Sequence, residues 1–147
     1  MASDGYRIRV FFYGSFMSTA VLRQHKADVS CAVSAKLDGY QLSVRPRATL
    51  EKRNGSVVYG SLAFIKACDV SRLYEQLRSD FGITYRPFPV QVEIYDGTSR
   101  DAVCFISYDE QVVVADPSYV RELAECAKDL KVPDDYIRHI MSFTTRI

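Results

Sequence analysis

The residues best suited to chemistry lie near the N-terminus, where the apolar stretch 10–12 runs directly into Tyr13-Gly14-Ser15. A strand that ends in a glycine–serine turn can leave several backbone N–H groups unpaired and pointing in one direction. Such a turn can hold a carboxylate or a developing oxyanion without any basic side chain. We therefore expect this turn, continued by Phe16 and Met17, to form one wall of any active site.

The other residues with obvious chemical potential stand apart from one another. The cysteines and histidines form no CxxC pair and no short metal-binding spacing; they are Cys31, Cys68, Cys104, Cys126, His25 and His139. Zinc sites and redox motifs usually need closer spacing, so we expect buried free thiols of a cytoplasmic protein. Ser15 has no histidine partner in a recognisable pattern, which favours a turn residue over the nucleophile of a hydrolase triad.

Length and charge limit the classes of function. A chain of 147 residues suits one domain, 1–147, with one sizeable core. Its 19 basic and 18 acidic residues leave a net charge of +1, which gives no electrostatic case for a nucleic-acid or membrane partner. No apolar run approaches the roughly 20 residues of a membrane span. Residues 1–5 lack the basic-then-apolar layout of a signal peptide.

The elements around the turn begin with strands. Alternation and turn residues predict strands over 7–13, 30–37, 40–44 and 56–65, with a short helix over 19–24. Asp38-Gly39 is a good turn pair between the second and third strands, and Asn54-Gly55 predicts a solvated turn. Gly60 lies inside the fourth strand and suggests a bulge or bend in a curled sheet.

The second half mixes helices and strands. We expect a helix capped by Asp69 that ends near Asp80 before Gly82, then strands over 85–95 and 102–108. Pro87 and Pro89 indicate that the first of these strands lies at an edge. Asp116-Pro117 opens a further helix, which breaks at 132–135 and restarts. This order predicts an α+β fold with a mostly antiparallel, curled sheet and helices packed on it.

Four segments occur in the same order as in a known family. They are Phe12–Met17; Asp38-Gly39-Tyr40 with Val57–Leu62; Leu73 and Leu77 followed by Gly82 and Tyr85-Arg86; and Asp116–Tyr119 with Val132–Ile137. Together they resemble the γ-glutamylcyclotransferase-like family, which includes the plant avirulence-induced-gene-like proteins. The resemblance covers nearly the whole chain. It implies a small mixed or antiparallel β-barrel flanked by helices, with its pocket at the Tyr13-Gly14-Ser15 turn.

The resemblance also implies a reaction. The α-amine of a γ-glutamyl compound attacks its own γ-carbonyl, 5-oxoproline forms, and an amine or amino acid leaves. Because the reaction is intramolecular, positioning can supply much of its rate. A carboxylate could carry the proton from the α-ammonium to the leaving nitrogen, and backbone N–H groups of residues 14–17 would stabilise the oxyanion. No metal or organic cofactor is required, and we expect a monomer or homodimer with a small γ-glutamyl partner.

One position departs from the pattern of that family. Its members carry L-D-x-x-E-G at the end of the central helix, and the glutamate is the acid/base. A register fixed by Gly82 and Tyr85-Arg86 places Phe81 at the glutamate position. A second register, which starts at Leu73, places Leu77 there but loses the glycine. Neither phenylalanine nor leucine can transfer a proton.

Three interpretations follow from this departure. In the first, Asp80 replaces the glutamate, although its side chain is one methylene shorter. In the second, the pocket binds a small amine or amino-acid-like ligand without catalysis. In the third, the acid/base comes from elsewhere, with Glu75 or a tyrosine as candidates. Tyr13 and Tyr85 are the tyrosines that we expect at the substrate. Arg45 and Arg47 flank Pro46 in a loop that could bring either arginine to a substrate carboxylate.

Overall fold

The computed structural model describes residues 6–107 and 115–144. Its sheet is a closed barrel in the order β1-β3-β2-β4-β5, formed by β1 (Arg7–Phe12), β2 (Val29–Val44), β3 (Ala48–Lys66), β4 (Arg86–Ile94) and β5 (Ser99–Ile106). All pairings are antiparallel except that of β1 with β5, where Val10 lies opposite Val103 and closes the barrel. The expected α+β class with a curled, mostly antiparallel sheet is confirmed.

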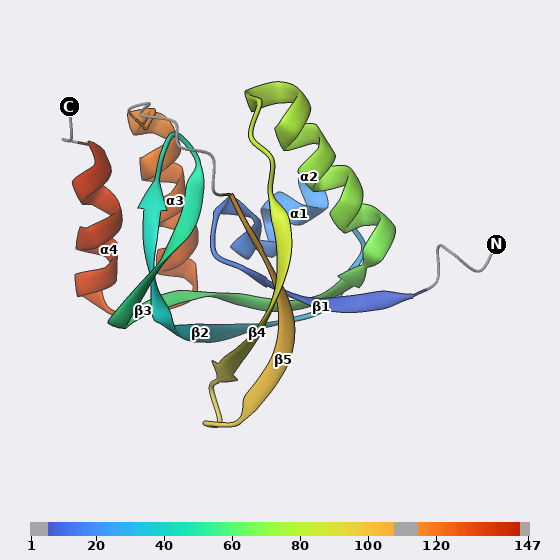
Figure 1. Cartoon of the computed structure of the whole chain (residues 1–147), viewed down its shortest axis with the longest axis horizontal. Coiled ribbons are helices and arrows are strands. Elements are labelled where there is room, and N and C mark those ends of the chain that lie inside the picture. Colours follow the sequence, from blue (N-terminus) through green and yellow to red (C-terminus); the bar gives the residue numbers. More distant parts are fainter. Residues whose placement is uncertain (1–5, 108–114, 145–147) are drawn as a thin grey trace.

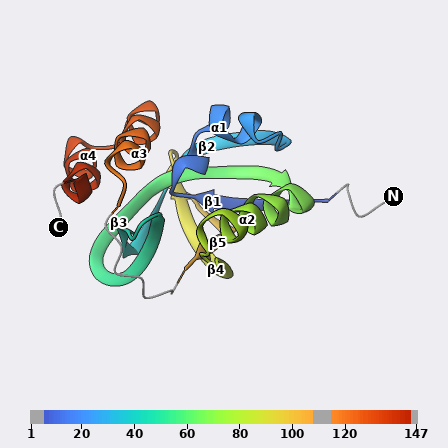
Figure 2. The same ribbon diagram turned by 90° about the horizontal axis from the view of Figure 1, so that it is seen from above.

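The helices flank the barrel. They are α1 (Thr19–Gln24), α2 (Ala67–Phe81), α3 (Pro117–Asp129) and α4 (Asp134–Met141). Figure 1 shows α3 and α4 side by side, α2 on the other side, and the short α1 between them. The view from above in Figure 2 gives the same separation. Across residues 6–107 and 115–144, none of the helices has the length and apolar character needed to cross a membrane.

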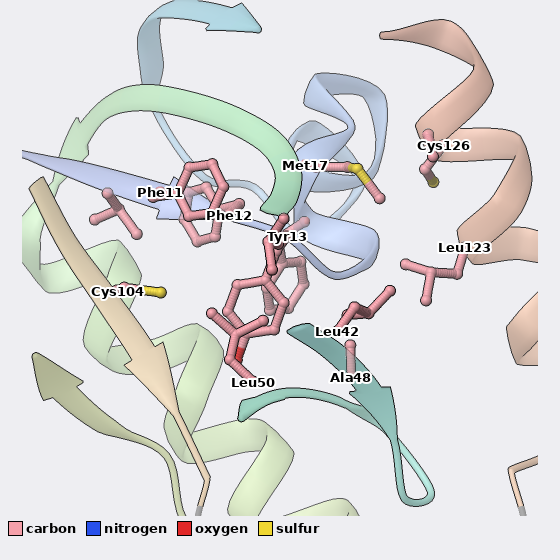
Figure 3. Close-up of a cluster of buried hydrophobic side chains, with 14 of the residues drawn as sticks. Phe11, Phe12, Tyr13, Met17, Leu42, Ala48, Leu50, Cys104, Leu123 and Cys126 are labelled. Atoms are coloured by element: carbon pink, nitrogen blue, oxygen red, sulfur yellow. The ribbon is translucent and has the colours of Figure 1, made fainter. Parts of the chain in front are cut away.

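The C-terminal end of β1 lies in the centre of the core. Val10, Phe11 and Phe12 are all buried, although successive residues of a strand point to opposite sides. This strand is therefore covered on both faces. In Figure 3 the ring of Tyr13 continues the row and points toward Leu50. The turn that follows β1 is consequently held by a rigid, buried strand.

Gly60 is required by close approach rather than by a bulge. A Cβ atom placed on Gly60 would lie 2.1 Å from the carbonyl oxygen of Phe12, a distance that real Cβ atoms do not show. The pairing of β2 with β3 continues through Ala35 and Gly60 without a register shift, so the expected bulge is absent there. The close approach seats β1 against β3 immediately before the Tyr13-Gly14-Ser15 turn.

Two expected turns are instead irregularities inside long strands. Gly39 and Gly55 have φ angles of +85° and +84°, but they lie within β2 and β3 and do not separate hairpin strands. The pairing shifts between Asp38 and Tyr40 and then resumes with Tyr40 opposite Lys52. The prediction of separate strands 30–37 and 40–44 is therefore wrong. A positive φ at glycine satisfies a bulge as well as a reversal, and the chain reverses at 45–47 instead.

The ends of the helices follow local signals in most cases. Asp116 accepts a hydrogen bond from the N–H of Ser118 at 3.0 Å, and Gly82 caps α2 with a φ of +70°, both as expected. The N-cap of α2 is Lys66 rather than Asp69. Asp69 lies in the first turn, where its carboxylate accepts a hydrogen bond from the N–H of Asp28 at 2.8 Å. Position 108 of the expected last strand and residues 1–5 lie outside the described residues.

Candidate functional site

The turn after β1 forms a tight 3₁₀ helix, Ser15–Met17, that leads into α1. Gly14 has extended backbone angles (φ −95°, ψ −154°), and its carbonyl oxygen accepts a hydrogen bond from the N–H of Met17 at 2.9 Å. The N–H of Ser18 donates to Ser15 at 3.2 Å, and the Ser18 hydroxyl caps α1. The sequence therefore produces the sharp turn predicted for it.

Three backbone donors of this turn are open. The hydrogen bonds found within residues 6–107 and 115–144 do not use the N–H groups of Gly14, Ser15 and Phe16. The N–H of Met17 is already bonded to Gly14, and the Met17 side chain is buried. Met17 therefore supports the turn from within the core, and the donor set is smaller than the expected run 14–17. Consecutive free N–H groups of this kind favour an oxygen with negative charge.

A small pocket adjoins these donors. It has a volume of about 30 Å³ and is bordered by the turn, β1, β3, α2 and α3; its lining includes Tyr13, Gly14, Ser15, Phe16, Arg47, Ala48, Tyr74, Leu77, Tyr85 and Tyr119. We call it the inner pocket. A volume of this size holds a single oxygen-sized group, since one water needs about 10–15 Å³ on the same measure. The lining contains no carboxylate.

Tyrosine hydroxyls fix the backbone around the inner pocket. Tyr13 donates to the carbonyl of Phe105 at 2.5 Å, and Tyr85 donates to the carbonyl of Ala48 at 2.7 Å. The N–H of Ala48 donates to the hydroxyl oxygen of Tyr119 at 3.2 Å. The bonds of Tyr13 and Tyr85 are therefore structural. Tyr119 accepts a bond and retains its own proton as a donor beside Gly14, where a Cβ would lie 3.6 Å from its oxygen.

Burial keeps these phenols protonated. It raises the pKa of Tyr13 and of Tyr74 well above the ordinary value, with smaller contributions from neighbouring ionisable groups. The pKa of Tyr119 is also raised by burial, although the nearby Arg47 guanidinium opposes the change. At neutral pH Tyr13, Tyr74 and Tyr119 are therefore hydrogen-bond donors and not bases. This weakens the interpretation in which one of them is the acid/base.

A wider cleft opens next to the inner pocket. Its volume is about 240 Å³, and it lies between α1, α2 and α3; Ser15, Phe16, Arg47 and Leu77 border both cavities. We call it the outer cleft. Asp80 on α2 and Glu122 on α3 line it, and neither has a hydrogen bond or ion pair within the described part of the chain. The outer cleft therefore contains the carboxylates that the inner pocket lacks.

The two residues that could occupy the glutamate position, Leu77 and Phe81, differ in the cavities that they line. Leu77 lines both the inner pocket and the outer cleft, whereas Phe81 lines only the outer cleft. Glu75 lines neither cavity, is exposed, and forms an ion pair with Arg78, which lowers the pKa of its carboxyl. Asp80 is thus the one of the two candidate carboxylates that faces the site.

Tyr119, Glu122 and His25, which were not expected at the site, complete it together with Arg47, which was a possible anchor for a carboxylate. Tyr119 and Glu122 come from α3, and Arg47 comes from the connection between β2 and β3. His25 also lines the outer cleft, with its ring edge-on to Phe16 at 5.6 Å between centroids. Tyr119 belongs to the family-like segment Asp116–Tyr119, but nothing in the local sequence marked Tyr119 or Glu122 as a site residue, because they meet the turn only through tertiary packing. Within residues 6–107 and 115–144, no three His, Cys, Asp or Glu side chains gather as a metal site would require.

The structure is a closed barrel flanked by helices, with two adjoining cavities at the turn after β1. The fold is that of a γ-glutamyl cyclotransferase, to which the chain is 20% identical with a TM-score of 0.74, over 91% of this chain and 86% of that one. The match over residues 57–140 to the AIG2-like family then identifies the relationship, and the chain belongs to this family.

Other solved structures have the same fold. An uncharacterized protein from Homo sapiens is 21% identical with a TM-score of 0.71, over 91% of this chain and 86% of the other. An AIG2-like protein from Mus musculus is 14% identical with a TM-score of 0.56, over 78% of this chain and 83% of the other. Comparison with curated protein sequences gives no match.

Proposed function

We propose that the protein binds a small γ-glutamyl compound and cyclises it to 5-oxoproline, with release of an amine or amino acid. Membership of the AIG2-like family supports this reaction class. The observation that carries the proposal is the pairing of two adjoining cavities, one lined by open hydrogen-bond donors and the other by free carboxylates. A γ-glutamyl group needs both, because it carries a carbonyl that becomes an oxyanion and an ammonium that must lose a proton.

The γ-carbonyl oxygen binds in the inner pocket. The N–H groups of Gly14, Ser15 and Phe16 donate to it, and the hydroxyl proton of Tyr119 is a further donor beside Gly14. These donors are fixed by the buried end of β1, so they need no rearrangement when negative charge develops on the oxygen. Met17 and Tyr85 contribute by holding the backbone of the turn and of Ala48 in place.

Asp80 carries the proton in this proposal. It takes a proton from the substrate α-ammonium, and the freed amine attacks the γ-carbon to form the new C–N bond. When the tetrahedral intermediate collapses, the old amide C–N bond breaks and Asp80 returns the proton to the leaving nitrogen. The attacking nitrogen loses its second proton to water, and the released amine takes one up from water, so bonds and protons balance without a redox partner. General acid–base catalysis of this kind contributes about 10²- to 10⁴-fold.

A second candidate function is ligand binding without turnover. The observation that favours it is the side chain of Leu77, which faces the inner pocket at one of the two positions where the family pattern has its glutamate. In this version the same donors hold an amino-acid-like ligand, and Asp80 is an exposed residue near the end of α2.

The two functions differ in one measurable product. The purified protein is incubated with a panel of γ-glutamyl amines and γ-glutamyl amino acids, and 5-oxoproline is quantified. We expect 5-oxoproline from at least one member, and Asp80→Asn should lower kcat by about 10²-fold or more while leaving the thermal midpoint unchanged. Glu125→Gln on the outer face of α3 is the matched control for removing a surface charge, and its turnover should equal that of the wild type.

Three results of these assays would contradict the proposed reaction or the role of Asp80. No 5-oxoproline across the panel, together with thermal stabilisation by a panel member, would establish the binding module instead. Full turnover by Asp80→Asn would remove Asp80 from the mechanism. A loss of turnover in Glu75→Gln but not in Asp80→Asn would move the proton carrier to Glu75.

A further inference from the structure

Arg47 is held between two aromatic rings at the border of the two cavities. Its guanidinium carbon lies 4.0 Å from the ring centroid of Tyr119 and 4.6 Å from that of Phe81. Both distances are within the range of a cation–π contact. The two rings belong to α3 and α2, so the arginine bridges the helices on either side of the cavities.

The charge of Arg47 has no protein counter-ion. Within residues 6–107 and 115–144, its guanidinium forms neither an ion pair nor a hydrogen bond. Arg45, two residues earlier, is different: it forms an ion pair with Glu51 at 3.1 Å and lines neither cavity. Arg47 is therefore held in place by aromatic rings rather than by a carboxylate. Its guanidinium N–H groups remain available to donate hydrogen bonds to a ligand.

We infer that Arg47 binds the α-carboxylate of the ligand and that Phe81 is the positioning residue that holds its guanidinium. A planar guanidinium can donate two parallel hydrogen bonds to a carboxylate, and stacking limits the conformational freedom lost on binding. The inference deepens the proposed function, because it names the group that the ligand must carry. It also assigns a role to the aromatic side chain that one register puts in place of the family glutamate.

In this proposal, the three polar groups of a γ-glutamyl ligand bind at different parts of the site. The carbonyl occupies the inner pocket, which is too small for a carboxylate and an ammonium as well. The α-carboxylate pairs with Arg47, which borders both cavities, and the α-ammonium lies toward Asp80 and Glu122 in the outer cleft. A compound with the same skeleton but no α-carboxylate lacks the group that Arg47 recognises.

The test compares two ligands that differ only in that charge. 5-Oxoproline and its uncharged carboxamide are titrated into the wild-type protein, and binding is followed by NMR chemical-shift changes or calorimetry. We expect the acid to bind at least about tenfold more tightly than the amide, since a hydrogen bond to a charged group supports a tenfold to hundredfold difference. Arg47→Gln should abolish that preference, whereas Arg45→Gln should retain it.

A second variant separates positioning from charge. Phe81→Leu keeps Arg47 and removes one ring, so affinity for 5-oxoproline should fall by about two- to fivefold while the preference for the acid remains. Phe81 is 46% exposed, and the substitution leaves the core intact. Arg47→Lys should retain part of the preference, because it keeps the charge and loses the planar fork.

Several results would overturn the assignment. These are equal binding of acid and amide by the wild type, no binding of 5-oxoproline at millimolar concentration, or an acid preference that persists in Arg47→Gln. The outcome is independent of turnover. Arg47-dependent binding by a protein that forms no 5-oxoproline upholds the anchor and refutes cyclisation. Turnover with an unchanged KM in Arg47→Gln does the reverse.

Discussion

Replacing Gly14 with alanine should separate folding from ligand binding. The backbone angles of Gly14 (φ −95°, ψ −154°) lie in a region that ordinary residues can adopt. An added Cβ would lie 3.4 Å from the Cβ of Ala48 and 3.6 Å from the hydroxyl oxygen of Tyr119, which are ordinary contact distances. We therefore expect the free energy of unfolding to change by less than about 1 kcal/mol, or roughly 2–4 °C in Tm.

The same methyl group should be costly for a ligand. It would point toward Tyr119 and occupy space in an inner pocket of only about 30 Å³. A ligand oxygen displaced from there loses its hydrogen bonds to the turn. If two such bonds to a developing oxyanion are lost, at about 1.5–3 kcal/mol each, kcat/KM falls by roughly a hundredfold or more. A binding module would show an equivalent loss of affinity.

The assay pairs a thermal melt with the turnover or binding measurement on the same protein sample. A Gly14→Ala protein that melts like the wild type and retains full activity would refute the placement of the ligand at this turn. A large loss of stability would instead refute the contact geometry on which the magnitude rests. Either result can be read without knowledge of the leaving amine.

Other predictions concern the barrel and the thiols. Gly60→Ala should lower stability by about 2 kcal/mol or more, seen as a lower urea midpoint, because its Cβ would collide with the carbonyl of Phe12; an unchanged midpoint would contradict the close approach. The expectation of buried thiols is correct for Cys104 and Cys126 but wrong for Cys31 and Cys68, which are exposed. Thiol labelling should therefore be fast at Cys31 and Cys68 and slow at the other two until the protein unfolds. Burial raises the pKa of Cys104 to about 12 and that of Cys126 to about 11, above the value of an unfolded thiol. Stability should therefore be complete below about pH 8.5 and decline as pH rises further, measurable as a falling urea midpoint.

Local signals predicted the elements that hold the site. The strand that ends at Tyr13-Gly14-Ser15, the helix Thr19–Gln24, the glycine stop at Gly82 and the Asp116 cap all depend on residues within one turn of the feature. Such signals predict the folded structure correctly because neighbouring residues alone satisfy the hydrogen-bonding and conformational needs of the backbone at these positions. They predict the positions of the turn and of the end of α2 along the chain, but not the distance between the two in space.

The errors arose where long-range pairing decided the outcome. Gly39 and Gly55 have the positive φ angles typical of hairpins, yet pairing between β2 and β3 continues beyond both. Asp69 has a side chain suited to an N-cap, but its carboxylate instead accepts a hydrogen bond from the backbone N–H of Asp28, 41 residues away. Arg47 and Tyr119 are likewise separated by a long stretch of sequence. Their contact exists only because α3 returns to the barrel end beside the β2–β3 connection.

The apolar residues Leu77 and Phe81, which the two registers place at the family glutamate position, limit how the proposed γ-glutamyl ligand can lie. Leu77 and Phe81 are four residues apart on α2, so they share a face, and the former borders both cavities while the latter stacks on Arg47. With no carboxylate in the inner pocket, a proton carrier has to act from the outer cleft. Under the proposed function, the α-amine would then reach Asp80 from the same side on which its carboxylate would meet Arg47. In that arrangement only the γ-carbonyl would enter the inner pocket, and the leaving group would extend away from the turn, where the outer cleft rather than the barrel would constrain its size.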